Sequence, residues 1–339
     1  MSELLIWGAG AVDGTIGASL VRAGQDVLLV DADAEHVAAM RGRGLAIEGP
    51  IERFTVPVRV ALPEEVSGRF DRILLCVKAH HTEAATRALL PHLAESGYVA
   101  SLQNGLNEPL IGGIVGMHRV IGAFINFGAD MIAPGRILYG GRGACVLGEL
   151  DGRPSARLDG LHARLLCFEP AATVTDDIFG YLWGKLGYGA LLFATAVTNE
   201  SIADVLEAPE YRAILVALAR EVIAVSLARG VRPRGFNGFD PAAFAPGGDD
   251  AAIAASFNTM VSHNRRSAKS HSGIWRDLAI RKRRTEVDAQ LDPVVETGVP
   301  VAAPLTRRLI TMIHQIEDGA RLLDRANLLA LAHSLPESI

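Results

Sequence analysis

The chain has 339 residues, of which 49% are hydrophobic and 21% charged, and its formal net charge is −5. This length and composition suit two domains with a sizeable buried core, and they exclude a generally disordered chain. The negative charge argues against nucleic acid as a partner. The N-terminal apolar run is too short for a signal peptide or a membrane span, so we expect a cytoplasmic protein without membrane contact.

Three cysteines, Cys76, Cys145 and Cys167, stand in apolar surroundings without CxxC spacing. We expect them to be reduced core residues. No His, Cys, Asp or Glu cluster has metal-ligand spacing: the adjacent His80 and His81 should point in different directions on a helix. We therefore predict no metal.

The first thirty residues have the pattern of a dinucleotide-binding βαβ unit. An apolar run, Leu4–Trp7, breaks at Gly8, a helical segment follows, and a second apolar run, Val27–Val30, ends at Asp31. Gly8 permits a tight turn, and Gly10 lets backbone N–H groups approach a pyrophosphate at the start of the helix. We predict a nucleotide cofactor held by Gly8, Ala9, Gly10, Ala11, Val12 and Asp31.

The carboxylate of Asp31 indicates which nucleotide binds. It accepts hydrogen bonds from a ribose 2′-OH but repels a 2′-phosphate. Asp33 and Glu35 add two acids, and no Arg or Lys stands among them. NAD is therefore favoured over NADP. Asp33 and Glu35 also fit a helix N-cap and first turn, a role compatible with the first.

The glycine fingerprint is irregular after Gly10. Asp13 stands where a third glycine is usual, and Gly14 and Gly17 follow it. These two glycines can supply the smooth helix face that packs on the strand. Asp13 near a pyrophosphate would be unfavourable unless its side chain points away.

Strand-like and helix-like runs continue to alternate after Asp31. We predict strands at residues 56–61, 73–77, 98–102, 120–127 and 144–147, a helix at 82–93, and a turn at Pro134-Gly135. This alternation predicts a mostly parallel, doubly wound Rossmann-type sheet over residues 1–175.

The periodicity becomes helical throughout from about residue 176. We predict helices at 178–206, 210–229, 251–263, 276–297 and 305–317, hence an all-α domain over residues 176–339. The Pro- and Gly-rich segment 232–248 is either a lid or, more commonly for such segments, a surface loop. The apolar helix at 213–227 is compatible with a homodimer, although core packing explains it equally.

Candidate chemistry lies at strand ends and in two helices. Ligands of doubly wound sheets bind at the carboxyl ends of the strands, where Val77-Lys78 and Asn104 stand. Lys185 lies within an otherwise apolar helix, and burying a lysine is costly without a role. With Glu286 it can form a proton donor and its partner, although a structural ion pair remains the alternative.

Six motifs, in order, resemble the ketopantoate reductase family. They are Gly8-Ala9-Gly10-Ala11-Val12, Cys76-Val77-Lys78-Ala79, Gln103-Asn104-Gly105, Trp183-Gly184-Lys185-Leu186, Arg284-Thr285-Glu286-Val287-Asp288, and Gly298-Val299-Pro300 with Pro304. The resemblance implies an NAD(P)-dependent oxidoreductase in which Lys185 protonates the oxygen formed by hydride transfer to a 2-keto acid. It also implies that Lys78 and Asn104 hold substrate and nicotinamide, with Glu286 near the substrate.

The chain departs from that family at the substrate positions. Gly189 and Phe193 stand where the family has substrate-binding asparagines, and the family's substrate serine falls on Gly273, with Ser272 and Ser270 close by. Asp31 replaces a basic or neutral residue. We therefore expect Gly189, Phe193 and Ser272 to line a pocket for a substrate other than ketopantoate, bulkier or more apolar.

These observations predict an NAD-dependent dehydrogenase or reductase acting on a small hydroxy or keto compound, with Lys185, Glu286 and Asn104 as catalytic residues. Basic residues of the segment 264–286 could bind a substrate carboxylate, although a solvated helix face explains most of them. Two alternatives remain open: an opine- or imine-type dehydrogenase, and a non-catalytic NAD-sensing protein.

Overall fold

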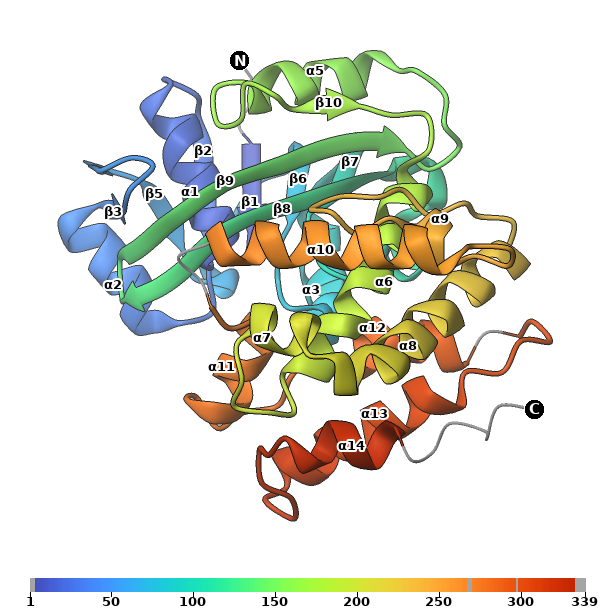
Figure 1. The fold of residues 1–339 in the computed structure, drawn as a ribbon. Helices are drawn as coiled ribbons and strands as arrows, with labels where there is room; N and C mark the ends of the chain where they lie inside the picture. Colours follow the sequence, from blue (N-terminus) through green and yellow to red (C-terminus); the bar gives the residue numbers. More distant parts are fainter. Residues whose placement is uncertain (1–3, 267–269, 297, 333–339) are drawn as a thin grey trace. The chain divides into compact units, whose positions relative to one another are not determined.

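The computed structural model describes residues 4–266, 270–296 and 298–332. The chain divides into two compact units: a sheet unit, residues 1–178, and a helical unit, residues 179–339 (Figure 1). Within the described ranges, no helix is both long and apolar enough to cross a membrane.

The sheet unit is built on a ten-stranded mixed sheet with the order β4-β3-β9-β8-β7-β6-β1-β2-β5, and β10 pairs with β9. Strands β1, β2, β5, β6, β7 and β8 are parallel to one another, as predicted. The strands are β1 Leu4–Trp7, β2 Val27–Val30, β3 Leu45–Glu48, β4 Phe54–Val56, β5 Arg59–Ala61, β6 Phe70–Leu75, β7 Leu93–Ser101, β8 Val120–Ala133, β9 Arg136–Glu149 and β10 Thr173–Val174.

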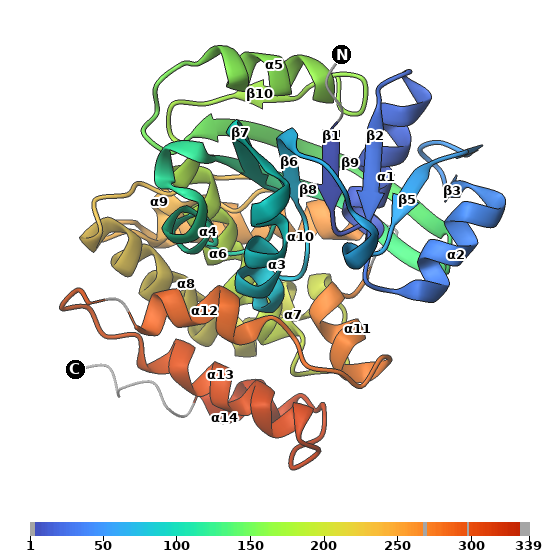
Figure 2. The same cartoon turned by 180° about the vertical axis from the view of Figure 1, so that it is seen from behind.

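Strand β1 lies between β2 and β6 and is buried on both faces. Leu4 and Ile6 belong to one apolar core, and Leu5 and Trp7 belong to the other, as the two-residue period of a strand requires. Helices α3 and α4 cover one face of the sheet, whereas α1 and α5 cover the other (Figures 1 and 2). The helices are α1 Ala11–Arg22, α2 Ala34–Arg43, α3 Thr82–Leu89, α4 Glu108–Val115 and α5 Ala156–Leu165, with 3₁₀ turns η1 Pro63–Glu65, η2 Ala79–His81, η3 Leu90–His92 and η4 Met117–Arg119.

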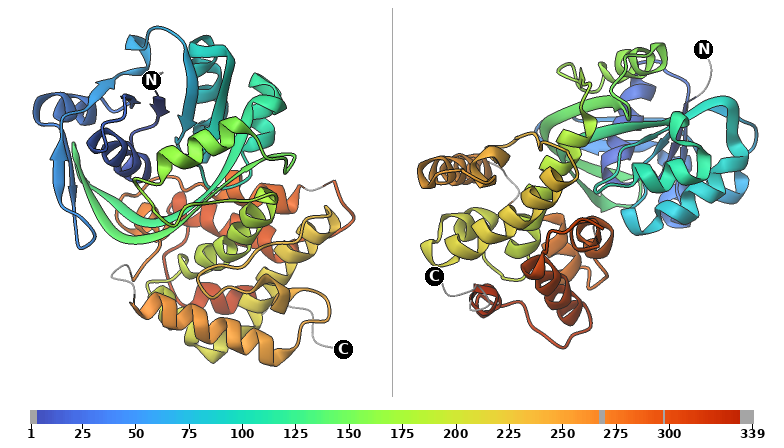
Figure 3. Two further views of the ribbon diagram at one scale, coloured as in Figure 1. Left: turned by 90° about the horizontal axis from the view of Figure 1, so that it is seen from above. Right: turned by 90° about the vertical axis from the view of Figure 1, so that its right-hand side faces the viewer.

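The largest difference from the predicted sheet is the β8–β9 hairpin. Both strands have 14 residues, roughly twice the predicted length or more, and they pair antiparallel around the predicted turn at Pro134-Gly135. Figure 3 shows the hairpin bending along its length. The short strands β3, β4 and β10 were not predicted either, because two to four residues without strong alternation give no clear strand signal.

The helical unit contains no named strand among the residues that the structure describes. Its helices are α6 Ile178–Thr195, which begins at the last residue of the sheet unit, α7 Ile202–Glu207, α8 Pro209–Ala228, α9 Pro241–Phe244, α10 Asp250–Arg266, α11 Gly273–Ala279, α12 Val287–Val295, α13 Pro304–Glu317 and α14 Ala326–Ala332. The single helix predicted for 276–297 was wrong. The chain leaves α11 at Ala279, Lys282 adopts a left-handed φ of 49°, and α12 begins only at Val287.

The segment 232–248, for which a lid or a surface loop was expected, packs on α6 of its own unit. The N–H of Arg234 donates to the carbonyl of Gly180 on α6 (2.8 Å), and the Phe236 ring lies 5.4 Å from that of Tyr188. A Cβ at Gly184 would collide with the Arg234 carbonyl. The glycines of α6 therefore let this segment pack directly on the helix.

The cysteines confirm the expected free thiols but not all of the expected burial. Cys145 is buried and Cys76 is half-buried, whereas Cys167 is exposed. The prediction that Cys167 is a core residue was wrong, since Cys167 lies two residues beyond the end of α5 and is exposed.

Candidate active site

The glycine turn after β1 has the geometry that a dinucleotide requires. Gly8 has a φ of +106°, and a Cβ there would lie 2.9 Å from both the Cys76 carbonyl carbon and the Val77 nitrogen. Gly10 is the N-cap of α1, and a Cβ there would meet no atom within 4 Å. Only glycine fits the first position. The second faces open space at a helix N-terminus, where a phosphate is favoured.

The peptide group of Ala9, between these glycines, is held on both sides. Its N–H donates to Asp31 Oδ2 (2.9 Å), and its carbonyl lies 3.0 Å from His36 Nε2. The Gly135 N–H donates to the other ring nitrogen of His36 (2.9 Å), so the neutral ring carries its proton on Nε2 and donates it to Ala9. The imidazole is buried. His36 thus joins the glycine turn to the β8–β9 turn, a role that its sequence position gave no means of predicting.

Asp31 and Asp33 have different roles. Asp31 accepts from Ala9 with Oδ2 and from the Asp33 N–H with Oδ1 (2.9 Å), which leaves lone pairs on both oxygens. Asp33 caps α2 by accepting from the N–H groups of Glu35 and His36. The proposed cap role of Asp33 is confirmed, and Asp31 is oriented at the end of β2.

Asp13, which stands where a third glycine is usual, lies in the first turn of α1. It is 4% exposed and lies against the thiol of Cys76 at the end of β6. Burial raises the pKa of Cys76 well above its ordinary value, and the charge of Asp13 and its hydrogen bond to the thiol raise it further. A Cβ at Gly14 would meet Ile137, and one at Gly17 would meet Leu29, so these glycines provide the close packing predicted for them.

The ends of β6 and β7 carry the other predicted cofactor residues, Val77, Lys78 and Asn104. The buried Gln103 side chain donates to the Val77 carbonyl (2.7 Å) and to Thr82 Oγ1 (2.8 Å). Asn107 Nδ2 donates to the Asn104 carbonyl (2.7 Å), and its Oδ1 accepts from Thr82 (3.1 Å). Sequence reasoning missed this Gln103–Thr82–Asn107 network, which links the two strand ends.

The histidines after Lys78 do not diverge as predicted. Their Nε2 atoms lie 3.0 Å apart, because His80 and His81 lie in a 3₁₀ turn rather than an α-helix. Among the described residues, no group of three or more His, Cys, Asp or Glu side chains is placed to hold a metal ion.

Helix α6 carries the predicted proton donor of the helical unit. Lys185 is half-buried, and Gly189 lies one turn further along the same side of the helix. A Cβ at Gly189 would be 3.9 Å from Gln290 Oε1 on α12, so the two helices are neighbours there. Phe193, predicted to line the substrate pocket, is fully buried.

The predicted substrate serine has a structural partner. Ser272 is buried, and its hydroxyl accepts from the Trp275 N–H (3.1 Å), which makes it the N-cap of α11. Glu286 is half-buried and occupies the N-cap position of α12, one turn before Gln290.

Four arginines of the segment 264–286 bind carboxylates within the helical unit. The pairs are Arg265 with Asp204 and Glu207, Arg281 and Arg283 with Asp277, and Arg284 with Glu317 and Asp318. These guanidinium groups have structural partners, so binding of a substrate carboxylate would compete with them. Lys269 of the same segment lies outside the described residues.

Comparison with known proteins identifies the family. Residues 4–152 match the family described as ketopantoate reductase PanE/ApbA, and residues 177–317 match its C-terminal region. The chain belongs to the ketopantoate reductase family. A 2-dehydropantoate 2-reductase of Mesorhizobium japonicum is 30% identical over 253 residues, or 68% of this chain and 77% of the relative. One from Archaeoglobus fulgidus is 27% identical over 94% of this chain and 99% of the relative.

Solved structures agree. A PanE/ApbA family ketopantoate reductase from Ralstonia eutropha JMP134 has a TM-score of 0.78 and 28% identity, covering 94% of this chain and 99% of that one. A D-mandelate dehydrogenase solved with NADH and anilino(oxo)acetate has a TM-score of 0.80 over the same shares, but at 21% identity it shows a likeness of fold alone. This family member is thus a ketopantoate reductase-like oxidoreductase with an NAD(P)-binding fold.

Proposed function

We propose that this protein is an NAD-dependent dehydrogenase or reductase that acts on a small 2-hydroxy or 2-keto acid other than ketopantoate. The observation that carries the proposal is the carboxylate of Asp31, oriented against the glycine turn by the Ala9 and Asp33 N–H groups. No Arg or Lys stands within residues 31–35 to neutralise a 2′-phosphate. NADP would meet uncompensated negative charge there.

The residues of the sheet unit fit this cofactor. The open space at Gly10 and the N-terminus of α1 accept a pyrophosphate, and Asp31 has lone pairs left for the ribose hydroxyls. Val77, Lys78 and Asn104 stand at neighbouring strand ends, where a nicotinamide ring would be held. A nicotinamide cofactor held there would supply hydride transfer to or from the carbinol carbon of the substrate.

The helical unit supplies the proton chemistry. Lys185 Nζ gives a proton to the oxygen of the keto acid during reduction and takes it from the hydroxyl during oxidation. Glu286 orients substrate and ammonium group, and Lys78 and Asn104 of the sheet unit also hold the substrate. NAD-linked enzymes usually oxidise, so we assign oxidation of the hydroxy acid as the physiological direction.

The substrate is expected to be more apolar than ketopantoate. Gly189 offers no side chain where the resemblance implies a substrate-binding asparagine, so a polar substrate group there would lose a hydrogen-bond partner.

A panel of 2-hydroxy acids and 2-keto acids, measured with NAD(H) and NADP(H) side by side, tests the proposal. We expect turnover of an apolar 2-hydroxy acid with NAD at a kcat/KM at least ~10-fold above that with NADP. Wells with an added amine would reveal an imine-forming dehydrogenase by amine-dependent turnover.

The variant Asp31→Asn should lower the NAD-to-NADP ratio of kcat/KM by about 10-fold or more, because the amide keeps an acceptor for Ala9 but removes the charge. Asp33→Asn is the matched control: asparagine caps helices as well as aspartate does, so the ratio should stay within about twofold. A wild-type enzyme that prefers NADP would contradict the cofactor assignment.

A further inference from the structure

The loops that carry Lys78 and Asn104 lie beyond the point where the pairing of their strands ends. The register of β6 and β7 ends at Leu75 and Ser101, and the Leu102 N–H donates to the Leu75 carbonyl (3.0 Å). Lys78 and Asn104 each stand three residues beyond the last paired position of their strand. The position of one loop relative to the other therefore depends on contacts outside the strand ladder.

Two buried amide side chains, those of Gln103 and Asn107, hold the backbone of these loops. Gln103 is 4% exposed, and its Nε2 donates to the Val77 carbonyl (2.7 Å) in the loop after β6. Asn107 is 5% exposed, and its Nδ2 donates to the Asn104 carbonyl (2.7 Å) in the loop after β7. One amide thus holds the residue before Lys78, and the other holds Asn104 itself.

The hydroxyl of Thr82 joins the two amides. Thr82 is the first residue of α3 and is fully buried. Its Oγ1 accepts from Gln103 Nε2 (2.8 Å) and donates to Asn107 Oδ1 (3.1 Å). The Ala79 carbonyl also lies 2.7 Å from Oγ1, so the single hydroxyl proton is shared between two acceptors. A continuous chain of hydrogen bonds therefore runs through one hydroxyl from the loop after β6 to the loop after β7.

The burial of this chain of hydrogen bonds makes each member difficult to replace. Removal of the Thr82 hydroxyl would take away the acceptor of one Gln103 N–H and the donor to Asn107 Oδ1. A buried polar group that loses its partner carries a large desolvation cost. The two amides would therefore reorient, and the loops that they hold would move with them.

We propose that Thr82 is a positioning residue that, through Gln103 and Asn107, fixes Lys78 and Asn104 relative to each other at the carboxyl ends of β6 and β7. The inference rests on the proposed function, because it requires that Lys78 and Asn104 hold the nicotinamide and the substrate. Thr82 is enclosed by protein, so it acts through the loops rather than by touching a reactant. A displacement of about 1 Å in a group that positions substrate can cost on the order of 100-fold in rate.

The first test measures the Kd for NADH by fluorescence titration of Thr82→Val, which replaces the hydroxyl with a methyl group of similar size. The Kd should rise by about 5-fold, because the loops at the nicotinamide end lose their common support. Thr82→Ser keeps the hydroxyl and should return the Kd to within about twofold of the wild-type value. This measurement needs no substrate, so it holds whichever compound the protein turns over.

Thr86→Val is the matched control. Thr86 lies one turn further along α3 and is also fully buried, and its hydroxyl donates to the Thr82 carbonyl (2.7 Å). The substitution removes a buried hydroxyl from the same helix but leaves both amides with their partners, so the Kd for NADH should equal that of the wild type. Melting curves give the temperature at which every variant is folded. Asn107→Leu, which removes no side-chain cap from α4, replaces Thr82→Val if that variant does not fold.

The second test measures kcat/KM with the preferred 2-hydroxy acid. Thr82→Val alone should lower kcat/KM by about 10-fold or more. In a variant that already carries Lys78→Ala and Asn104→Ala, the same substitution should change kcat/KM by less than about twofold, since a residue that acts through others adds nothing once their side chains are gone.

The outcomes separate the positioning role from the proposed function. An unchanged Kd for NADH in folded Thr82→Val, equal weakening in Thr86→Val, or a loss of kcat/KM that persists in full without the Lys78 and Asn104 side chains would overturn the positioning role and leave the reaction in place. Absence of turnover with every 2-hydroxy and 2-keto acid would overturn the proposed function, and the NADH titration would still decide whether Thr82 positions the loops.

Discussion

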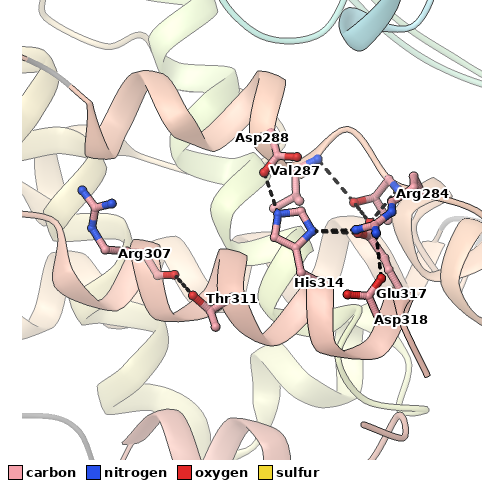
Figure 4. Close-up of polar contacts among 9 residues, drawn as sticks. Arg284, Val287, Asp288, Arg307, Thr311, His314, Glu317 and Asp318 are labelled. Carbon is pink, nitrogen blue, oxygen red and sulfur yellow. Dashed lines mark hydrogen bonds and ion pairs between the residues drawn. The ribbon is translucent and has the colours of Figure 1, made fainter. Parts of the chain in front are cut away.

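Two short segments, the glycine turn of the sheet unit and residues 284–288 of the helical unit, present functional groups in different ways. The turn is held by partners from the end of β2 and from α2: Asp31 and His36 bind the single peptide group of Ala9. The second segment is held by Glu317, which binds Thr285, and by His314, which binds Asp288, about thirty residues further along the chain (Figure 4). The first also needs a glycine at position 8, where only a residue without a Cβ fits, whereas the second is held mainly by charged side chains.

The two segments should therefore respond to different perturbations. The glycine turn should be intolerant of a single added methyl group, because backbone atoms fill the space around Gly8. A segment held by an imidazolium between two carboxylates should tolerate small changes of volume but respond to titration.

The largest effect is expected at Gly8. Gly8→Ala forces a Cβ to 2.9 Å from the backbone of Cys76 and Val77 at a φ of +106°, so both stability and NADH binding should fall. The left-handed conformation alone costs about 1–2 kcal/mol, and the collision adds to it. We expect at least ~100-fold weaker NADH binding by fluorescence titration, together with a lower melting temperature.

Gly10→Ala separates the effect on stability from the effect on NADH binding. Its Cβ enters space with no protein atom within 4 Å, so the melting temperature should stay close to that of the wild type. NADH binding should still weaken, because the methyl group occupies the approach of the pyrophosphate. Equal NADH affinity for Gly10→Ala and the wild type would show that the phosphate binds elsewhere.

A smaller effect on stability is expected from the titration of His314. Burial lowers the pKa of His314, but hydrogen bonds to Glu317 and Asp288 and the charges of these residues outweigh it, so the pKa is raised. A raised pKa gives stability that is complete below the unfolded value, about 6.5, and is lost as the pH rises through the folded value. The charged groups around the ring are Asp288, Asp292, Glu317, Arg284 and Asp318.

The measurement compares melting temperatures of the wild type and His314→Gln at pH 6 and pH 9. The advantage of the wild type should be larger at pH 6 and should shrink by roughly 2–4 °C at pH 9, the shift that about 1 kcal/mol produces in a domain of the size of the helical unit. An advantage that grew with pH would contradict the imidazolium assignment.

The sheet unit could be predicted from sequence in most of its functional parts. The turn from Gly8 to Gly10, the strand ends at Asp31 and Val77, and the cap role of Asp33 depend on local patterns of glycine, apolar runs and acids. The length of the β8–β9 hairpin could not be predicted, because the outer half of β8 is only half-buried and lacks a clear alternation.

The all-α class of the helical unit could be predicted, but the break between α11 and α12 and the long-range polar contacts could not. The break between α11 and α12 depends on Arg281 and Arg283 binding the buried Asp277 (3.1 and 2.9 Å), a pairing that helical periodicity does not reveal. The contacts of Glu317 with Thr285 and of His36 with Ala9 join residues distant in sequence, and neither partner belongs to a recognisable motif. Long-range polar pairs of this kind carry no signal in a single sequence.

The most direct test of the account measures turnover and NADH binding on the same Lys185 variants. Lys185→Ala should lower kcat by about 10²–10⁴-fold while the Kd for NADH stays within about twofold of the wild type. Lys185→Arg should lose turnover as well, because a guanidinium keeps the charge but does not exchange its proton at neutral pH. Near-normal turnover by Lys185→Ala with the preferred substrate would contradict the assignment of the proton donor to the helical unit.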